Sequence, residues 1–175
     1  MIIGIGGSSR AGKTTLAEIV MWHFRTQNLR AIAIHQDDYV KPIHQIPLIN
    51  GQTDWETPAS IDFQLLKTSL EFHQQHFDVI ILEGILTFAN DEINKLFGQT
   101  FFVEISENTF KKRRRADKRW GTEQAWYLNH VWKSFLKYGQ PPADLKNMVM
   151  LDGEIEYQAK DIIPYIPKTL ISSYL

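Results

Sequence analysis

The chain has 175 residues, 43% of them hydrophobic and 12% aromatic, which is enough for one domain around a single substantial core. Lys and Arg total 19 against 20 for Asp and Glu, so the net charge of -1 excludes a general attraction to nucleic acid or to an anionic membrane. Without cysteine, disulfides, thiolate metal sites and cysteine nucleophiles are excluded. No apolar run approaches the ~20 residues that a membrane span needs, and the first residues suit a strand better than a signal sequence. We therefore expect a soluble, cytoplasmic protein.

Apolar runs and helical periodicity alternate along the chain. Runs that suit buried parallel strands cover residues 2–5, 31–34, 79–82, 100–105 and 148–151. Between them, the spacing of apolar residues predicts helices over 13–26, 61–75, 107–118 and 123–138. This alternation is typical of an α/β fold, with a five-stranded parallel sheet, right-handed crossovers and helices on both faces. The pattern predicts a single domain over residues 1–175.

The segment between the first strand and the first helix reads Gly-Ser-Ser-Arg-Ala-Gly-Lys-Thr, a full match to the phosphate-binding loop (P-loop) pattern G-x-x-x-x-G-K-[ST]. Its glycines let the backbone N–H groups curl toward phosphate oxygens, and the helix adds the positive end of its dipole. Lys13 is expected to hold the β and γ phosphates of ATP, and the Thr14 hydroxyl Mg²⁺. The alternative, a chance match in a Gly/Ser-rich turn, leaves the flanking strand and helix unexplained. The sequence thus predicts an ATP site formed by Gly7, Ser8, Ser9, Arg10, Ala11, Gly12, Lys13, Thr14 and Thr15.

Carboxylates follow two of the predicted strands. Asp37 comes directly after the second strand, at the sheet edge where ligands of such folds gather, and suits a base for an attacking hydroxyl. Glu83 ends the third strand, where a carboxylate reaches a Mg²⁺-bound water. We expect the metal beside Thr14, Asp37 and Glu83. The alternatives are an ordinary turn or helix-cap residue for the aspartate and a solvated strand-end acid for the glutamate.

Residues 111–119 contain seven basic residues and one acid. Three interpretations compete. Clustered Lys and Arg can bind nucleic acid, but the near-neutral total charge and the lack of interleaved aromatics disfavour this. A solvated helix face is the second. We favour the third, a short basic lid around residues 112–124 that closes over the nucleotide and supplies arginines to the transferring phosphoryl group.

Other aromatic and histidine residues divide into two groups. Those around residues 126–138 recur near helical spacing and are interpreted as core, and the six histidines lack a metal-ligand spacing and are interpreted as surface or capping residues. Trp55, in the long irregular stretch 39–59, and Trp120, just past the basic run, lie in polar surroundings. An indole there is costly unless it packs or binds something flat, so a stacked base or pyridine ring would explain both.

Several of these segments together resemble the uridine kinase and nicotinamide riboside kinase group of P-loop kinases, over the chain from the first strand to about Gly153. The resemblance is closest to the nicotinamide riboside kinases. It rests on the P-loop and on the segments 36–42 (QDDYVKP), 54–58 (DWETP), 82–84 (LEG), 112–115 (KRRR), 130–138 (HVWKSFLKY) and 151–153 (LDG).

This resemblance implies a role for each matching residue. Asp37 would be the catalytic base and Glu83 would lie near Mg²⁺. Glu56 and Arg115 would bind the ribose 2′ and 3′ hydroxyls, with Arg115 and Lys13 also serving catalysis. Two departures stand out: Glu56 replaces the usual Asp, and the lid after Arg115 reads Ala-Asp-Lys-Arg-Trp. The remaining implied contacts are Tyr39 with the substrate, Trp55 and Trp120 on either side of its ring, and Lys118 or Arg119 with the ATP phosphates.

The expected reaction is ATP-dependent phosphorylation of a ribose 5′ hydroxyl, with nicotinamide riboside as the preferred small-molecule substrate. Its pyridinium is cationic, and two indole faces would attract it by ~0.5 to 2 kcal/mol each. A uridine or cytidine kinase, another small-molecule P-loop kinase and a non-kinase P-loop regulator remain the alternatives. A GTPase is disfavoured because the chain has no N-K-x-D and no D-x-x-G after the P-loop. The oligomeric state stays open.

Overall fold

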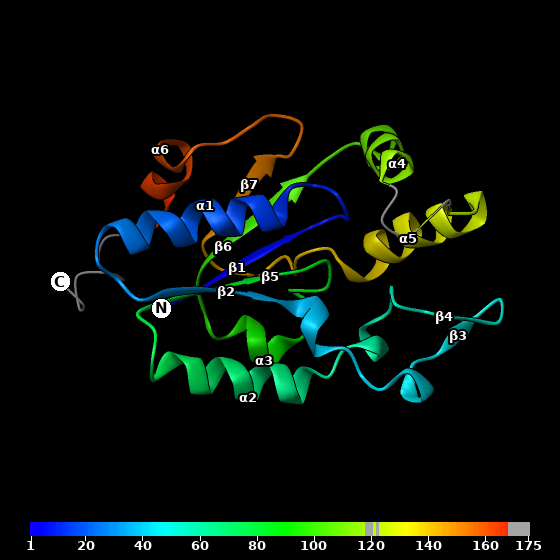
Figure 1. Ribbon diagram of the computed structural model, residues 1–175, viewed down its shortest axis with the longest axis horizontal. Helices are drawn as coiled ribbons and strands as arrows, with labels where there is room; N and C mark the ends of the chain where they lie inside the picture. The colour runs from blue at the N-terminus through cyan, green and yellow to red at the C-terminus, as the bar shows by residue number, and fades with distance from the viewer. Residues whose placement is uncertain (118–120, 122, 168–175) are drawn as a thin grey trace.

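The computed structural model describes residues 1–117, 121 and 123–167, and its centre is a parallel sheet (Figure 1). Within the described residues this sheet has five strands in the order β2-β5-β1-β6-β7, and every neighbouring pair is parallel. The predicted strands are thereby confirmed, most of them with one or two extra residues. The strands are β1 (Ile2–Gly7), β2 (Ala31–His35), β5 (Val79–Glu83), β6 (Phe97–Glu104) and β7 (Met148–Asp152).

Helices cover both faces of the sheet, as predicted. In Figure 1, α1 and α6 lie on one side of the sheet, and α2 and α3 lie on the other. Short helices α3 and α6 were not expected, and each has only four residues. The helices are α1 (Lys13–Thr26), α2 (Phe63–Gln74), α3 (Asp91–Asn94), α4 (Glu107–Ala116), α5 (Ala125–Tyr138) and α6 (Ala159–Ile162).

Strand β1 shows why helices pack on both faces of the sheet. Alternate side chains of a strand point to opposite faces of the sheet. Ile3 and Ile5 lie in one core cluster with Phe24 of α1, while Ile2 lies in a second cluster with Leu66 of α2. All five side chains are at most 1% exposed. The two clusters fix the helices on the sheet, and with them the residues at its carboxyl edge.

The stretch after β2 has more structure than the irregular segment that the sequence predicted. Its backbone closes on itself, because Lys41 N donates to Ser60 O over 2.8 Å and Asp62 N donates to Tyr39 O over 2.8 Å. A short hairpin stands at its tip, with residues 50 and 51 at φ 48° and 75°. Two positive φ angles in an Asn-Gly turn are the usual hairpin connection, a signal that the sequence analysis missed. The stretch comprises η1 (Gln36–Tyr39), η2 (Ile43–Gln45), β3 (Leu48–Ile49), β4 (Gln52–Thr53) and η3 (Pro58–Ser60).

Beyond β7, the described chain ends in α6 and the short 3-10 helix η4 (Ile163–Tyr165). Pro164 stands at the start of η4 and lacks the N–H that a continuing α-helix needs. The region therefore does not form one regular helix. None of the helices in the described part of the chain is both long enough and apolar enough to cross a bilayer.

Candidate active site

The P-loop connects β1 to α1 through positive φ angles, which residues other than glycine rarely adopt. Gly7 and Gly12 have φ of 145° and 100°, and Arg10 has φ of 66°. A Cβ on Gly7 would lie 2.3 Å from the carbonyl oxygen of Val103, so the loop lies directly on β6. Gly12 caps α1 without any side-chain hydrogen bond. The first N–H groups of the helix therefore remain available to an anion.

Lys13 is the buried cation of the site. Its side chain is 7% exposed, and its Nζ donates a hydrogen bond to Ser8 O over 2.9 Å. Burial lowers the pKa of Lys13, while the negative charges of Glu83, Asp37 and Glu56 act against that shift. Lys13 thus lies among the three carboxylates that the sequence assigns to the metal, the base and the ribose.

Glu83 and His35 end two adjacent strands. In the register of β2 with β5, His35 stands directly opposite Glu83. The Glu83 Oε1 atom accepts a hydrogen bond of 2.9 Å from Thr14 Oγ1 and is 2.8 Å from His35 Nδ1. A hydroxyl and a carboxylate are oxygen ligands of the kind that Mg²⁺ prefers, so this donor set fits the metal expected from the sequence.

Asp37 lines a cavity of about 440 Å³. The surrounding protein raises the pKa of Asp37, mainly by displacing water from its carboxylate, and Glu83 adds repulsion while Lys13 opposes the rise. The structure brings the candidate base, the candidate metal residues and most of the P-loop to this one cavity. Its lining comprises Ser9, Arg10, Gly12, Lys13, Thr14, Thr15, Asp37, Glu83, Gly84, Ile85, Arg113 and Ala116.

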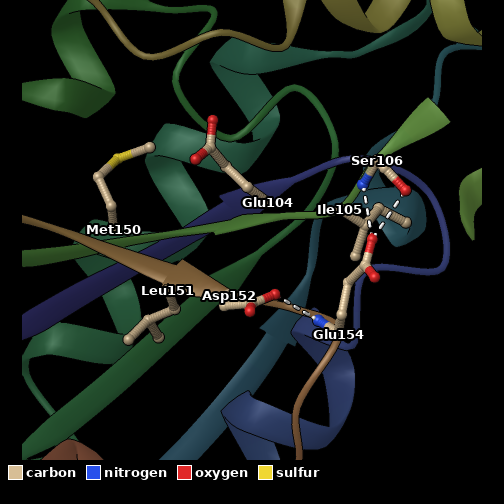
Figure 2. Close-up of a pocket in the computed structure, with 7 residues that line it drawn as sticks. All are labelled: Glu104, Ile105, Ser106, Met150, Leu151, Asp152 and Glu154. Carbon is tan, nitrogen blue, oxygen red and sulfur yellow. Dashed lines mark hydrogen bonds between the residues drawn. The ribbon is translucent and has the colours of Figure 1, made fainter.

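A second hollow, of about 410 Å³, lies where β6 and β7 end (Figure 2). The acidic side chains here hold the turn that follows β7. Glu154 accepts hydrogen bonds from Ser106 N and Oγ over 3.0 and 2.8 Å, and Asp152 accepts one from Glu154 N over 2.9 Å. A Cβ on Gly153 would lie 2.7 Å from Ala11 O. The turn is therefore pressed against the P-loop, and we assign this hollow a supporting role.

Helix α4 is joined to the P-loop by its basic residues. Arg113 Nη1 donates to Arg10 O over 3.1 Å and to Gly153 O over 2.9 Å. The guanidinium of Arg10 in turn forms an ion pair of 2.6 Å with Asp117, the residue after the helix. Part of the basic run therefore contacts the P-loop.

Arg114 makes a further contact with the P-loop. Its Nη1 donates to Ser9 Oγ over 2.7 Å, and its Nε and Nη2 donate to the two carboxylate oxygens of Glu123 over 2.7 and 2.6 Å. Arg115, to which the resemblance assigns the ribose, is exposed. Consecutive residues of a helix point in different directions. The structure therefore brings Arg114, and not Arg115, to the P-loop.

The irregular stretch 39–59, called the long loop below, contributes Glu56, which is 8% exposed. Burial raises the pKa of Glu56 to about 7, although the positive charge of Arg114 acts against the rise. Tyr127, in α5, donates its hydroxyl to Glu56 Oε1 over 3.4 Å. The indole of the neighbouring Trp55 is 41% exposed and open to a partner. Glu56 and Trp55 therefore differ sharply in their access to solvent.

Asp54 and His130 fix the same loop to α5. His130 Nε2 and Asp54 Oδ1 are 2.7 Å apart, and each side chain is 16% exposed. Asp54 Oδ1 also accepts a hydrogen bond of 3.1 Å from Glu56 N. This pair holds the backbone of the loop at the residue that the resemblance assigns to the ribose.

The chain is similar to several known kinases, although no family model matches it. The chain is 28% identical to mouse nicotinamide riboside kinase 2, with 87% of each chain covered. It is 26% identical to human nicotinamide riboside kinase 1, over 87% of this chain and 83% of that one. It is also 25% identical to uridine kinase-like protein 3 of Arabidopsis thaliana, over 80% of this chain and 35% of that protein. The chain is a P-loop kinase resembling nucleoside kinases.

Solved structures support the fold of this kinase. A possible uridine kinase from Bacillus stearothermophilus matches with a TM-score of 0.56 at 18% identity, over 87% of this chain and 88% of that one. A sugar kinase from Janibacter matches with a TM-score of 0.59 at 16% identity, over 98% and 90%. The P-loop NTPase fold predicted from the sequence is therefore confirmed.

One predicted site residue of the kinase contacts α2, and three others lie outside the residues that the structure describes. The hydroxyl of Tyr39 is 2.7 Å from Ser69 Oγ of α2, and its ring packs on the second core cluster. Tyr39 is thus held against α2, and its contact with substrate stays a prediction. Lys118, Arg119 and Trp120 lie outside the described residues, so the phosphate and ring contacts expected of them stay predictions.

The sequence analysis also missed residues that lie at the site. Tyr127 packs against the first core cluster, as interpreted, but its hydroxyl also reaches Glu56, a contact that the sequence did not predict. His35 and His130 were interpreted as surface or capping residues, yet each pairs with a carboxylate. For His35 a signal was available, because it directly precedes Gln-Asp-Asp at the carboxyl end of a strand.

Proposed function

We propose that this kinase transfers the γ-phosphoryl group of ATP to the 5′ hydroxyl of nicotinamide riboside and releases nicotinamide mononucleotide and ADP. The observation that carries the proposal is that Asp37, Lys13 and Glu83 meet at one cavity formed by the P-loop. The similarity to nicotinamide riboside kinases over 87% of the chain supports the choice of substrate.

In the proposed reaction, Asp37 orients the 5′ hydroxyl and accepts its proton. A bond forms between the 5′ oxygen and the γ-phosphorus, the bond from this phosphorus to the β–γ bridging oxygen breaks, and ADP leaves. The N–H groups at the start of α1 hold the phosphate oxygens. Lys13 exchanges its hydrogen bond with Ser8 O for the β and γ phosphates.

Thr14 and Glu83 would hold the Mg²⁺ of the nucleotide, with Asp37 nearby. When bound, Mg²⁺ neutralises negative charge on the transferring phosphoryl group. Lys13 and Arg114 add positive charge on the protein side, since one is buried in the P-loop and the other is bonded to Ser9. This combination favours phosphoryl transfer over simple nucleotide binding.

The pyridinium ring of the substrate would stack on Trp55, whose indole is exposed next to the buried Glu56. An indole face attracts a cation by about 0.5 to 2 kcal/mol, a gain that an uncharged uracil ring does not have. Glu56 would bind the ribose hydroxyls, held in place by Tyr127 and by the Asp54–His130 pair. Of these contacts, the one with Trp55 favours nicotinamide riboside over a pyrimidine nucleoside.

A uridine or cytidine kinase is the second candidate, because the chain is also similar to a uridine kinase-like protein. A pyrimidine would stack on Trp55 without the cation–π contribution. Both candidates use the same base, P-loop and metal site, so they differ only in the ring contacts.

The test is to incubate the purified protein with ATP, Mg²⁺ and nicotinamide riboside, uridine, cytidine or pantothenate, and to identify the products by mass. We expect the highest kcat/KM with nicotinamide riboside, and a larger loss with it than with uridine after Trp55→Ala. Preference for a pyrimidine nucleoside would overturn the substrate but keep the mechanism. ATP hydrolysis without a phosphorylated product would instead indicate a nucleotide-binding regulator.

A further inference from the structure

One oxygen of Glu83 accepts two hydrogen bonds. Oε1 is 2.9 Å from the hydroxyl of Thr14 and 2.8 Å from Nδ1 of His35. Among the described residues, no hydrogen bond reaches the other oxygen, Oε2. The carboxylate is thus fixed through one oxygen while the second stays open to another partner.

The strand register explains this arrangement. β2 and β5 are parallel neighbours, and residues His35 and Glu83 form the last matched pair of that register. Side chains of such a pair lie on the same face of the sheet. Because His35 stands at the end of a strand and not in a mobile loop, its ring has a fixed origin relative to the carboxylate.

The direction of the hydrogen bond follows from its acceptor. An ionised carboxylate can only accept, so Nδ1 of His35 carries the hydrogen and donates it to Glu83. Thr14 donates to the same atom but is also a predicted ligand of Mg²⁺. If Thr14 turns toward the metal, His35 remains as the group that restrains the rotation of Glu83.

We propose that His35 is a positioning residue that holds Glu83 in the orientation needed for the metal–nucleotide complex. Partners behind the residues around a metal orient them, and their removal typically weakens metal binding by about 10- to 100-fold. The inference rests on the magnesium-dependent site of the proposed function, but it needs no nucleoside. It adds to the chemistry a residue that neither contacts the nucleotide nor exchanges a proton with the substrate.

The test compares three variants of the full chain. His35→Ala removes the donor, whereas His35→Asn keeps an N–H close to the position of Nδ1. His76→Ala is the matched control, because His76 is an exposed histidine that follows α2 and lies outside the site. Thermal unfolding of each variant checks that the fold is intact.

The readout is binding of Mn²⁺, as a spectroscopic substitute for Mg²⁺, to the complex of the protein with ADP. Free Mn²⁺ is counted by electron paramagnetic resonance, and ADP binding without metal is measured by calorimetry. We expect His35→Ala to weaken Mn²⁺ binding by about 10-fold and to leave metal-free ADP binding unchanged. His35→Asn should restore most of the loss, and His76→Ala should match the unmodified protein.

Unchanged Mn²⁺ binding in His35→Ala would overturn the proposal, as would an equal loss of metal-free ADP binding. Nitrogen coupling to Mn²⁺ that disappears in His35→Ala would also overturn it, because His35 would then be a direct ligand. A protein that shows the expected effect but phosphorylates no nucleoside would refute the proposed function and leave this inference standing.

Discussion

At the scale of single residues, Asp37 decides whether the site can catalyse phosphoryl transfer to a hydroxyl. We expect Asp37→Asn to lower kcat by about 100-fold or more, because an amide cannot accept the proton of the attacking hydroxyl. ADP binding should be unchanged, since the amide has nearly the same shape. Steady-state kinetics with the best nucleoside and calorimetry with ADP measure the two effects. Normal turnover in the variant would exclude Asp37 as the base.

The environment of Asp37 also predicts a pH dependence. Its pKa is raised above the ordinary value of 3.8, chiefly by loss of water around the carboxylate and then by Glu83. Because the base must be ionised, kcat/KM should fall as the pH falls through this raised pKa. The decline should therefore begin at a higher pH than an ordinary aspartate would give. A pH profile of kcat/KM that stays flat down to the ordinary aspartate range would contradict this prediction.

Arg114 and Arg115 provide a matched pair for the lid. Only the first of the two contacts the P-loop, through Ser9. We expect Arg114→Ala to lower kcat/KM by about 10- to 100-fold, as a lost hydrogen bond to a charged group costs about 1.5 to 3 kcal/mol. Arg115→Ala should have a smaller effect. A larger loss from Arg115→Ala in the same kinetic assay would support Arg115 as the ribose residue and contradict this prediction.

Glu56 should make the stability of the protein depend on pH. Its pKa rises from 4.5 in the unfolded chain to about 7 in the fold, so its ionisation opposes folding as the pH rises through that range. Glu56→Gln cannot ionise. The free energy of unfolding of the variant relative to the unmodified protein should therefore increase by roughly 2 kcal/mol between about pH 5 and about pH 8. Urea denaturation at both pH values measures this, and a constant difference would show that Glu56 is solvated.

At the scale of elements, the site depends on how closely the P-loop lies on β6. A methyl group on Gly7 would come 2.3 Å from Val103 O, and Gly7 has a φ of 145°. We expect Gly7→Ala to lower the free energy of unfolding by about 2 kcal/mol or more and to abolish nucleotide binding. Gly51→Ala is the control, because Gly51 also has a positive φ but has open space around it. Equal losses for both in urea denaturation would mean that the close approach to β6 is unimportant.

The position of the long loop depends on a helix that is distant in the sequence. This helix is α5, which holds the loop through the Asp54–His130 pair and through the contact of Tyr127 with Glu56. The loop and the helix are separated by more than sixty residues in the sequence. Substrate contacts from one and support from the other therefore form only when the whole domain has folded.

At the scale of the whole molecule, the three core clusters of the described residues share the one sheet. We therefore expect residues 1–175 to unfold as a single cooperative unit, which ADP with Mg²⁺ stabilises by about 2.7 kcal/mol at 100 times its dissociation constant. Differential scanning calorimetry checks this through the equality of the calorimetric and van't Hoff enthalpies. Two separate transitions, of which ADP shifts only one, would contradict the single domain.

The sequence by itself determined the five strands of the sheet, the four longer helices and the P-loop between β1 and α1. Strands, helices and the P-loop depend on neighbouring residues: apolar runs, helical spacing and a glycine turn can all be read within a short window. The same local character made α1 predictable from residue 13 to residue 26, as the structure has it.

Only the tertiary structure decided which side chains meet at that site. His35 faces Glu83 because β2 lies next to β5, and Arg114 reaches Ser9 of the P-loop because α4 presents this residue, and not the next one along the helix, toward the loop. Strand order and helix rotation are set by packing between segments far apart in the chain, so no local pattern specifies them. The sequence therefore determined the reaction expected of this protein, and the fold decided which side chains are placed to support it.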